Sequence, residues 1–229
     1  MTSLLDRLLR WPVTAVLWKD VVLETRTKDT LVSVFVFALL SIVVFNFALN
    51  PTPQNVAVVA PGILWVAFTF GGVLGLTRSF AVEKERGGMQ SLLLTPAGRD
   101  SIYLGKVLSI FVFMIAVEVV TFPIFAVIYN LPLAAPEFIP VALLATLGIA
   151  AVGTLFSAMA VNTRAREVML PLLFLPIAVP VIVAAVEASG PAITGEPWGD
   201  AIQWLPILGV FDVVFLVICS LGFGYVVQD

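Results

Sequence analysis

Six long runs of apolar residues alternate with short polar stretches along the chain. The runs cover residues 31–49, 57–77, 106–130, 138–161, 168–188 and 202–227. A helix needs about 20 predominantly apolar residues to cross the hydrocarbon core of a bilayer, and each run is close to that length or longer. The stretches after the first and third runs are short, so we expect those neighbouring helices to form antiparallel hairpins. The pattern therefore predicts an all-α polytopic membrane protein with six transmembrane helices.

The residues before the first apolar run follow a different pattern. Val16 and its apolar neighbours share one helical face, and Lys19 and Asp20 lie on the other. This stretch is too short and too charged to span a bilayer, but it suits an amphipathic helix that lies in the plane of the membrane interface. We therefore divide the chain into residues 1–30, a cytoplasmic N-terminus with an interfacial helix, and residues 31–229, a six-helix transmembrane domain.

The positive charges fix the expected orientation of these spans. All twelve lysine and arginine residues fall in three segments, and the three polar stretches between those segments contain none. The basic segments are residues 7–28, 78–106 and 164–166. Cytoplasmic loops of membrane proteins carry an excess of Lys and Arg. We therefore expect both termini and two loops in the cytoplasm, and three short loops on the opposite side.

Composition excludes several classes of function. Hydrophobic residues make up 60% of the chain and charged residues only 12%, about half the share typical of soluble domains. Histidine is absent, which removes the most common general base, haem ligand and metal ligand. The nearest approach to a phosphate-binding loop, residues 98–107, has wrongly spaced glycines and Val107 where Ser or Thr should bind magnesium. We expect no nucleotide hydrolysis by this chain, no bound metal and no nucleic-acid binding, because topology explains the basic segments.

The longest cytoplasmic segment, residues 78–106, has the composition of a docking element. A charged cluster is followed by two glycines that permit a sharp turn, and then by a short helical stretch, residues 89–94, that ends at Pro96. We expect this stretch to dock onto a cytoplasmic partner; the alternative is a solvated loop whose leucines rest on the membrane surface. The residues expected to make the contact are Glu83, Glu85, Arg86, Gly87, Met89, Leu92 and Leu93.

Two acidic residues, Glu118 and Asp212, lie within the apolar runs. A charge at the centre of a bilayer costs about 2.5–3.5 kcal/mol on insertion scales, so such residues are usually protonated, paired or exposed to a cavity. No lysine or arginine lies deep within a span to pair with them, since Lys106 stands at the very start of the third run. Two acids without a base could form a proton path or share a proton; alternatively, Asp212 lies near the outer end of its span and contacts water.

Proline is unusually frequent in the fifth run. Pro171, Pro176 and Pro180 each remove a helical hydrogen bond and favour a kink. The segment that follows, residues 189–200, contains glycines as well as Pro191 and is predicted to be a loop.

Several of these stretches resemble known protein families. Residues 80–96, followed by residues 102–106, are similar to the acidic, glycine, leucine and proline coupling segment in membrane subunits of type-2 ABC exporters. Further stretches resemble the CcmB family, the haem-exporter membrane proteins of cytochrome c maturation. These stretches are residues 60–68, 166–176, 211–216 and 223–227. The resemblance covers essentially the whole chain.

The resemblance implies a non-catalytic permease subunit of the bacterial inner membrane. Such subunits pair with a separate cytoplasmic ATPase, CcmA, and with the membrane proteins CcmC and CcmD, and the complex serves haem delivery to the periplasmic chaperone CcmE. ATP hydrolysis by the partner would drive haem export or release of the haem-loaded chaperone. By analogy, two copies of the chain would match two ATPase subunits. The absence of histidine favours mechanical coupling, with haem held by a partner and no cofactor bound directly.

Three other functions fit the pattern and stay open at this point. A type-2 ABC exporter for a lipid, a drug or a polysaccharide precursor would share the architecture. A proton-coupled carrier would use Glu118 and Asp212 and would need no ATPase. A structural assembly factor would show no turnover.

Overall fold

The computed structural model of the chain describes residues 12–85, 98–133, 135–161, 163, 165–195 and 198–226. Seven α-helices and one short 3₁₀ helix make up almost all of this described part. In chain order they are α2 (Pro12–Thr27), α3 (Asp29–Leu49), α4 (Val56–Glu85), α6 (Arg99–Ile128), α7 (Phe138–Ala160), α8 (Arg166–Thr194), η1 (Gly199–Gln203) and α9 (Trp204–Val226). Six segments are long and apolar enough to cross a membrane, which confirms the predicted all-α polytopic fold.

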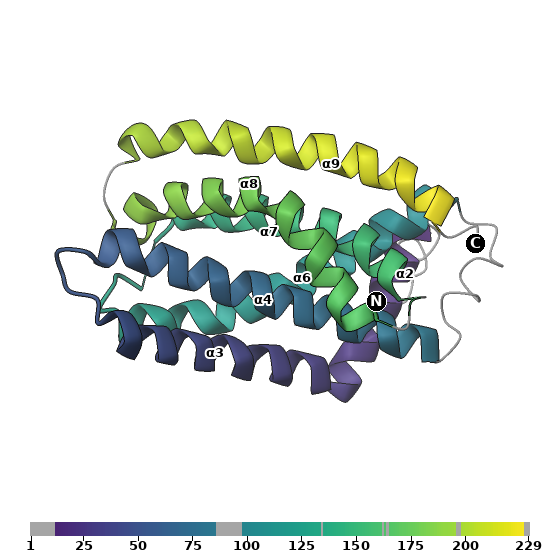
Figure 1. Ribbon diagram of the computed structural model, residues 1–229, viewed down its shortest axis with the longest axis horizontal. Helices are drawn as coiled ribbons and strands as arrows, with labels where there is room; N and C mark the ends of the chain where they lie inside the picture. Colours follow the sequence, from purple (N-terminus) through teal and green to yellow (C-terminus); the bar gives the residue numbers. More distant parts are fainter. Residues whose placement is uncertain are drawn as a thin grey trace, which may run out of the picture.

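The six long helices run along a common axis and form one bundle (Figure 1). Helix α7 occupies the centre, in contact with α4, α6, α8 and α9. It is rich in alanine and glycine, and small residues allow helices in a bilayer to approach closely. At Gly148 an added Cβ would lie only 2.7 Å from Asp212 Oδ1, and at Gly153 it would lie 2.4 Å from Leu76 Cδ1. The central position of α7 therefore depends on the absence of side chains at its crossing points.

Helix α3 lies at the periphery, against α4 and α6. Its buried apolar residues, Val34, Ala38 and Ile42, are four positions apart and so form a single stripe on one face. Val34 packs against Gly71 of α4, where an added Cβ would lie 3.1 Å from Val34 Cγ1. Most other side chains of α3 are at least partly exposed, as expected of a helix that faces lipid on several sides.

Two helices extend beyond the apolar runs. Helix α4 continues eight residues past residue 77, and α6 begins at Arg99 instead of residue 106. Residues 78–85 and 99–106, at the two ends of the predicted cytoplasmic loop, are therefore helical. Polar residues can continue these helices outside the hydrocarbon layer. The backbone N–H and C=O groups of a helix bond to one another whatever side chains the helix carries.

The predicted loop at residues 189–200 is wrong in its first half, because α8 continues to Thr194. Ser189 is fully buried and accepts a hydrogen bond of 2.8 Å from Nε1 of Trp65, which holds this end of α8 against α4. The packing outweighs the helix-breaking tendency of Gly190 and Pro191. The helix ends at Gly195, whose φ of 76° is a left-handed conformation that glycine adopts without strain.

Helix α2 lies at the end of the bundle where α4 ends and α6 begins (Figure 1). It starts at Pro12, a favoured residue in the first turn because its missing N–H would have no partner there. The helix packs mainly on α6, and Val16 is its buried apolar contact. The structure thus confirms the predicted amphipathic stretch around Val16 as a helix, while residues 1–11 lie outside the described chain.

Candidate functional site

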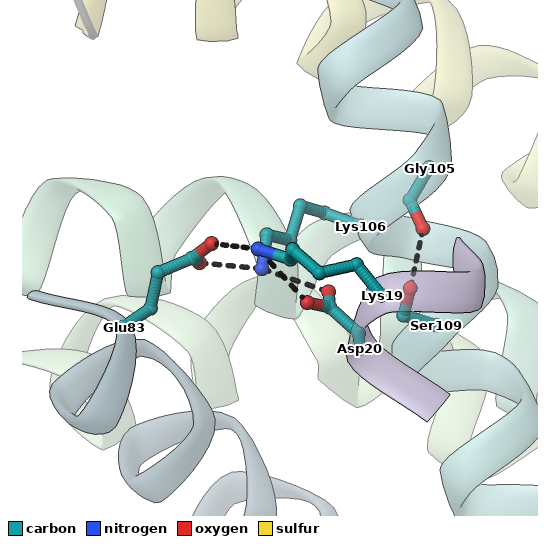
Figure 2. A network of polar contacts seen from close by, with 6 residues as sticks. All are labelled: Lys19, Asp20, Glu83, Gly105, Lys106 and Ser109. Atoms are coloured by element: carbon teal, nitrogen blue, oxygen red, sulfur yellow. Dashed lines mark hydrogen bonds and ion pairs between the residues drawn. The ribbon is translucent and has the colours of Figure 1, made fainter. Parts of the chain in front are cut away.

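Four charged side chains from three separate helices meet at the end of the bundle (Figure 2). Lys19 and Asp20 come from α2, Glu83 from the last turn of α4, and Lys106 from the first part of α6. Nζ of Lys19 lies 2.6 Å from Glu83 Oε1 and 3.1 Å from Asp20 Oδ1. Nζ of Lys106 lies 2.8 Å from Asp20 Oδ2 and also contacts Glu83 Oε2. We call these four residues the charged cluster.

The charged cluster is buried and electrically balanced. The Lys106 side chain is only 2% exposed and Glu83 is also buried, whereas Lys19 remains 42% exposed. Moving a charge out of water costs several kcal/mol unless it is paired, and here each ammonium contacts both carboxylates. The Lys106 ammonium also lies 5.6 Å from the centre of the Phe80 ring, within range of a cation–π interaction. Two positive and two negative charges therefore neutralise one another at a site where Lys106 and Glu83 are buried and Lys19 reaches the surface.

The pKa of Lys19 depends on both its burial and the two carboxylates that it contacts. Burial acts to lower its pKa, but the neighbouring charges of Asp20 and Glu83 and the hydrogen bonds to them act in the opposite direction, and the net effect is a raised pKa. A raised pKa means that the protonated form is favoured in the folded protein. Lys19 therefore stays protonated at neutral pH, and its contribution to stability is lost only as the pH rises above its ordinary pKa of 10.5.

A glycine brings α2 close enough to complete the cluster. Gly105 directly precedes Lys106, and an added Cβ there would lie 2.7 Å from Val16 Cβ and 3.0 Å from the Val13 carbonyl oxygen. The backbone of α2 thus rests directly on α6 at this point. The close approach places Asp20, one helical turn further along α2, within reach of Lys106.

Three other basic side chains attach the same end of the bundle to the remaining helices. Lys84 Nζ donates a 2.8 Å hydrogen bond to the carbonyl oxygen of Val161, directly after α7. Arg99 donates to the carbonyl oxygen of Gly224 near the end of α9, at 3.1 Å. Cations at helix C-termini interact favourably with the helix dipole and satisfy free carbonyls. Arg78 donates to the Ser33 hydroxyl of α3 at 2.7 Å. The ends of α4 and α6 are therefore bonded to α2, α3, α7 and α9.

The structure changes the interpretation of one residue expected to contact a partner. Glu83 is buried and both of its carboxylate oxygens face lysines, so it positions helices and does not present a free charge to a docking protein. Glu85 ends α4. The other expected contact residues, which are Arg86, Gly87, Met89, Leu92 and Leu93, lie outside the described residues.

The sequence places Lys19 and Asp20 on the polar face of the interfacial helix and Lys106 at the end of the cytoplasmic segment 78–106, and it does not show that they meet. The one available signal was that Lys106 opens an apolar run, where a lysine needs a partner or access to water. Nothing in the sequence identifies that partner, because Asp20 and Lys106 are 86 positions apart.

The two intramembrane acids occupy different sides of α7. Glu118 of α6 is 5% exposed, and its Oε1 accepts a 2.6 Å hydrogen bond from the Thr146 hydroxyl. Asp212 of α9 is 3% exposed and packs against Gly148, with no hydrogen bond to either carboxylate oxygen within the described residues. Thr146 and Gly148 are two positions apart on a helix, so they face different directions. The structure therefore does not bring the two acids together as a pair, and Asp212 is shielded instead of contacting water.

The Glu118 contact leads to a first testable expectation. Replacing Thr146 with valine keeps the side-chain shape but removes the donor, which leaves a buried carboxyl group without this partner. We expect the free energy of unfolding to fall by about 1–3 kcal/mol, measured as a lower melting temperature in mild detergent. Thr154→Val is the matched control, because Thr154 is equally buried in α7 but donates only to Ala150 of its own helix. Equal shifts in both variants would contradict the role given to the Thr146 hydroxyl.

No cluster of three histidine, cysteine, aspartate or glutamate side chains in the described part of the chain could hold a metal ion. The single cysteine, Cys219, is buried within α9. One turn further along the same helix, the Phe223 ring lies beside that of Tyr103 in α6, with 5.5 Å between the ring centres. These residues pack α9 against the rest of the bundle.

Comparison with known proteins agrees with this architecture. The family model described as CcmB protein matches residues 12–228. The chain is similar to a protein named heme exporter protein B from Pseudomonas aeruginosa, with 29% identity over 80% of this chain and 82% of the relative. It is also 29% identical to heme exporter protein B of Rhodobacter capsulatus, over 76% of this chain and 80% of the relative. A shorter match of 36% identity to the Escherichia coli protein of that name covers 32% of this chain. Since the family model spans nearly the whole sequence, the chain belongs to the CcmB family.

Proposed function

We propose that this protein is the membrane subunit of an ABC transport system for cytochrome c maturation. In this proposal it couples ATP hydrolysis by a separate subunit to haem export or to release of a haem-loaded periplasmic chaperone. The chain itself is non-catalytic. Family membership and relatives named heme exporter protein B support the haem-related assignment.

The observation that carries the coupling mechanism is the ion pair between Glu83 and Lys106. These residues lie on the two helices that flank residues 86–98, the segment proposed to dock onto the ATPase. A force applied to that segment reaches both helices through their backbones. It also reaches α2 through Lys19 and Asp20, whose contacts with Glu83 and Lys106 are direct. A mechanical input at one loop therefore acts on three helices at once.

The proposed partners follow from the family resemblance. They are a CcmA-like cytoplasmic ATPase, CcmC-like and CcmD-like membrane proteins, a CcmE-like periplasmic haem chaperone and a second copy of this chain. The basic segments favour an inner-membrane orientation with both termini in the cytoplasm. Haem is held by a partner in this proposal, so the purified subunit alone is expected to lack the absorption of bound haem; a stoichiometric haem spectrum would contradict this part.

The coupling proposal is tested by replacing both Leu92 and Leu93 with aspartate. Two charges on the apolar side of residues 89–94 should prevent docking, because burying an unpaired carboxylate in an interface costs several kcal/mol. We expect loss of copurification with the ATPase and loss of haem attachment to cytochrome c, while the subunit still inserts into the membrane. The measurements are haem staining of cytochrome c in cells and pull-down in mild detergent.

The matched control is Leu133→Asp, at an exposed leucine between α6 and α7, whose junction lies at the opposite end of the bundle (Figure 1). This variant should retain both the ATPase and cytochrome c assembly. Normal haem attachment in the Leu92 and Leu93 double variant would refute the docking role of residues 89–94.

A further inference from the structure

A groove next to the charged cluster runs between α2 and the transmembrane helices. Its wider part, about 400 Å³, is lined by polar and apolar residues of α2 together with the start of α3, the end of α4 and Lys106. A narrower part of about 120 Å³ continues from it between α2, α3, α4 and α6. Asp20, Glu24, Thr30 and Ser79 line both parts, so the two adjoin.

The narrow part is apolar and follows the axis of α6. Ser109, Val112, Phe113 and Ala116 line it in successive turns, opposite Gly75 of α4. Seven residues of helix rise about 10 Å, so this limb extends roughly that far from the charged end toward the middle of the bundle. Val112 and Ala116 are exposed, which leaves the limb open on the side of the surrounding lipid. A flexible hydrocarbon chain fits a limb with this shape and lining.

The wide part presents charges of both signs. Lys19, Asp20, Glu83 and Lys106 neutralise one another within the charged cluster, as described above. The remaining charged groups of the lining are Arg26, Glu24 and Asp29. One cation beside two carboxylates, with Arg26 and Asp29 both exposed, complements a headgroup that carries a phosphate and an ammonium. A purely anionic headgroup would face more negative than positive charge here, unlike the basic pockets that select anionic lipids.

We propose that this groove binds one phospholipid with a zwitterionic headgroup that bears a primary ammonium, such as a phosphatidylethanolamine. The phosphate pairs with Arg26, the ammonium lies between Glu24 and Asp29, and one acyl chain fills the limb along α6. The lipid then occupies the space between α2 and the helices behind it, beside the charged cluster and the hydrogen bond from the Leu31 N–H to Glu24 Oε1. The inference does not rest on the haem-related function proposed above, although the charged cluster lines part of the groove.

The acyl limb is tested on the full-length chain by native mass spectrometry after exchange into nanodiscs of phosphatidylcholine with phosphatidylethanolamine. We expect the unmodified chain to retain one phosphatidylethanolamine. Val112→Trp fills the limb from its exposed side and should weaken retention at least about tenfold. Val119→Trp is the matched control, because Val119 is exposed on the same face of α6 two turns further on and lies outside the groove. Ala116→Trp provides a second test should the first variant fold poorly.

The headgroup is tested by competition without any change to the fold. With phosphatidylethanolamine and phosphatidylglycerol at equal mole fraction, the unmodified chain should retain the former, and Asp29→Asn should reduce that preference. Preferential retention of phosphatidylglycerol would overturn the proposal. Retention of no lipid, or equal losses in Val112→Trp and Val119→Trp, would do the same.

Discussion

Replacing Lys106 with methionine is expected to lower the free energy of unfolding by about 3–5 kcal/mol. Methionine retains much of the apolar stem, so the change mainly removes the ammonium that contacts Asp20 and Glu83. The two carboxylates would then share only Lys19, which is itself partly exposed, and one buried negative charge would be left unbalanced. The melting temperature in mild detergent should fall by roughly 10 °C, given the usual relation for a chain of this size.

Two further variants separate charge balance from other effects of the Lys106 change. Lys84→Met removes an exposed lysine next to Glu83 in the last turn of α4. It should lower the free energy of unfolding by no more than about 1 kcal/mol. Combining Lys106→Met with Glu83→Gln removes one charge of each sign and should recover part of the lost stability. Equal melting temperatures for Lys106→Met and Lys84→Met would show that the cluster does not stabilise the fold.

A valine at Gly105 is expected to separate α2 from the rest of the bundle. The new side chain would meet Val16 Cβ and the Val13 carbonyl, and the backbone atom cannot move without the helix. Overpacking of this kind typically costs about 1–3 kcal/mol, and here the displacement also draws Asp20 away from Lys106. We expect amide hydrogen exchange in residues 12–27 to become faster by an order of magnitude or more, because α2 opens without global unfolding.

The same substitution at Gly62 serves as the control for Gly105. An added Cβ at Gly62 of α4 would meet nothing within 4 Å, so Gly62→Val should leave both exchange and the melting temperature nearly unchanged. Should the proposed coupling route hold, Gly105→Val also loses haem attachment to cytochrome c while Gly62→Val keeps it. Unchanged exchange of α2 in Gly105→Val would contradict the close contact between α2 and α6.

The transmembrane architecture could be predicted because its cause is local. Each span needs about 20 apolar residues in a row, and this requirement is visible without knowledge of any neighbour. The start of α7 at Phe138 and the end of α3 at Leu49 agree with the predicted runs for this reason. The ends of α4 and α8 were misplaced because tertiary contacts, such as that between Trp65 and Ser189, extend helices beyond their apolar runs.

The charged cluster could not be predicted because its cause is not local. Lys19 lies in a different basic segment from Lys106, Glu83 is 23 positions before Lys106, and the sequence offers each of them a separate explanation. The positive-inside pattern already explains why lysines occur at these positions, so the sequence gives no reason to look for partners of their side chains. In the same way, the depth of Glu118 was evident from the sequence, but its hydrogen bond to Thr146 depends on how α6 and α7 cross.

The prolines of α8 have a consequence for how the bundle deforms. Pro171, Pro176, Pro180 and Pro191 all lie within this one helix, whereas the proline of α7, Pro140, lies in the first turn, where it removes no helical hydrogen bond. A proline further along a helix removes an N–H that would have bonded the carbonyl four residues earlier, so the bending stiffness of α8 is reduced at several points along its length. Helix α8 packs against both α4 and α7. If α4 tilts in the proposed coupling, we expect α8 to bend at its prolines more readily than α7, which has none beyond its first turn.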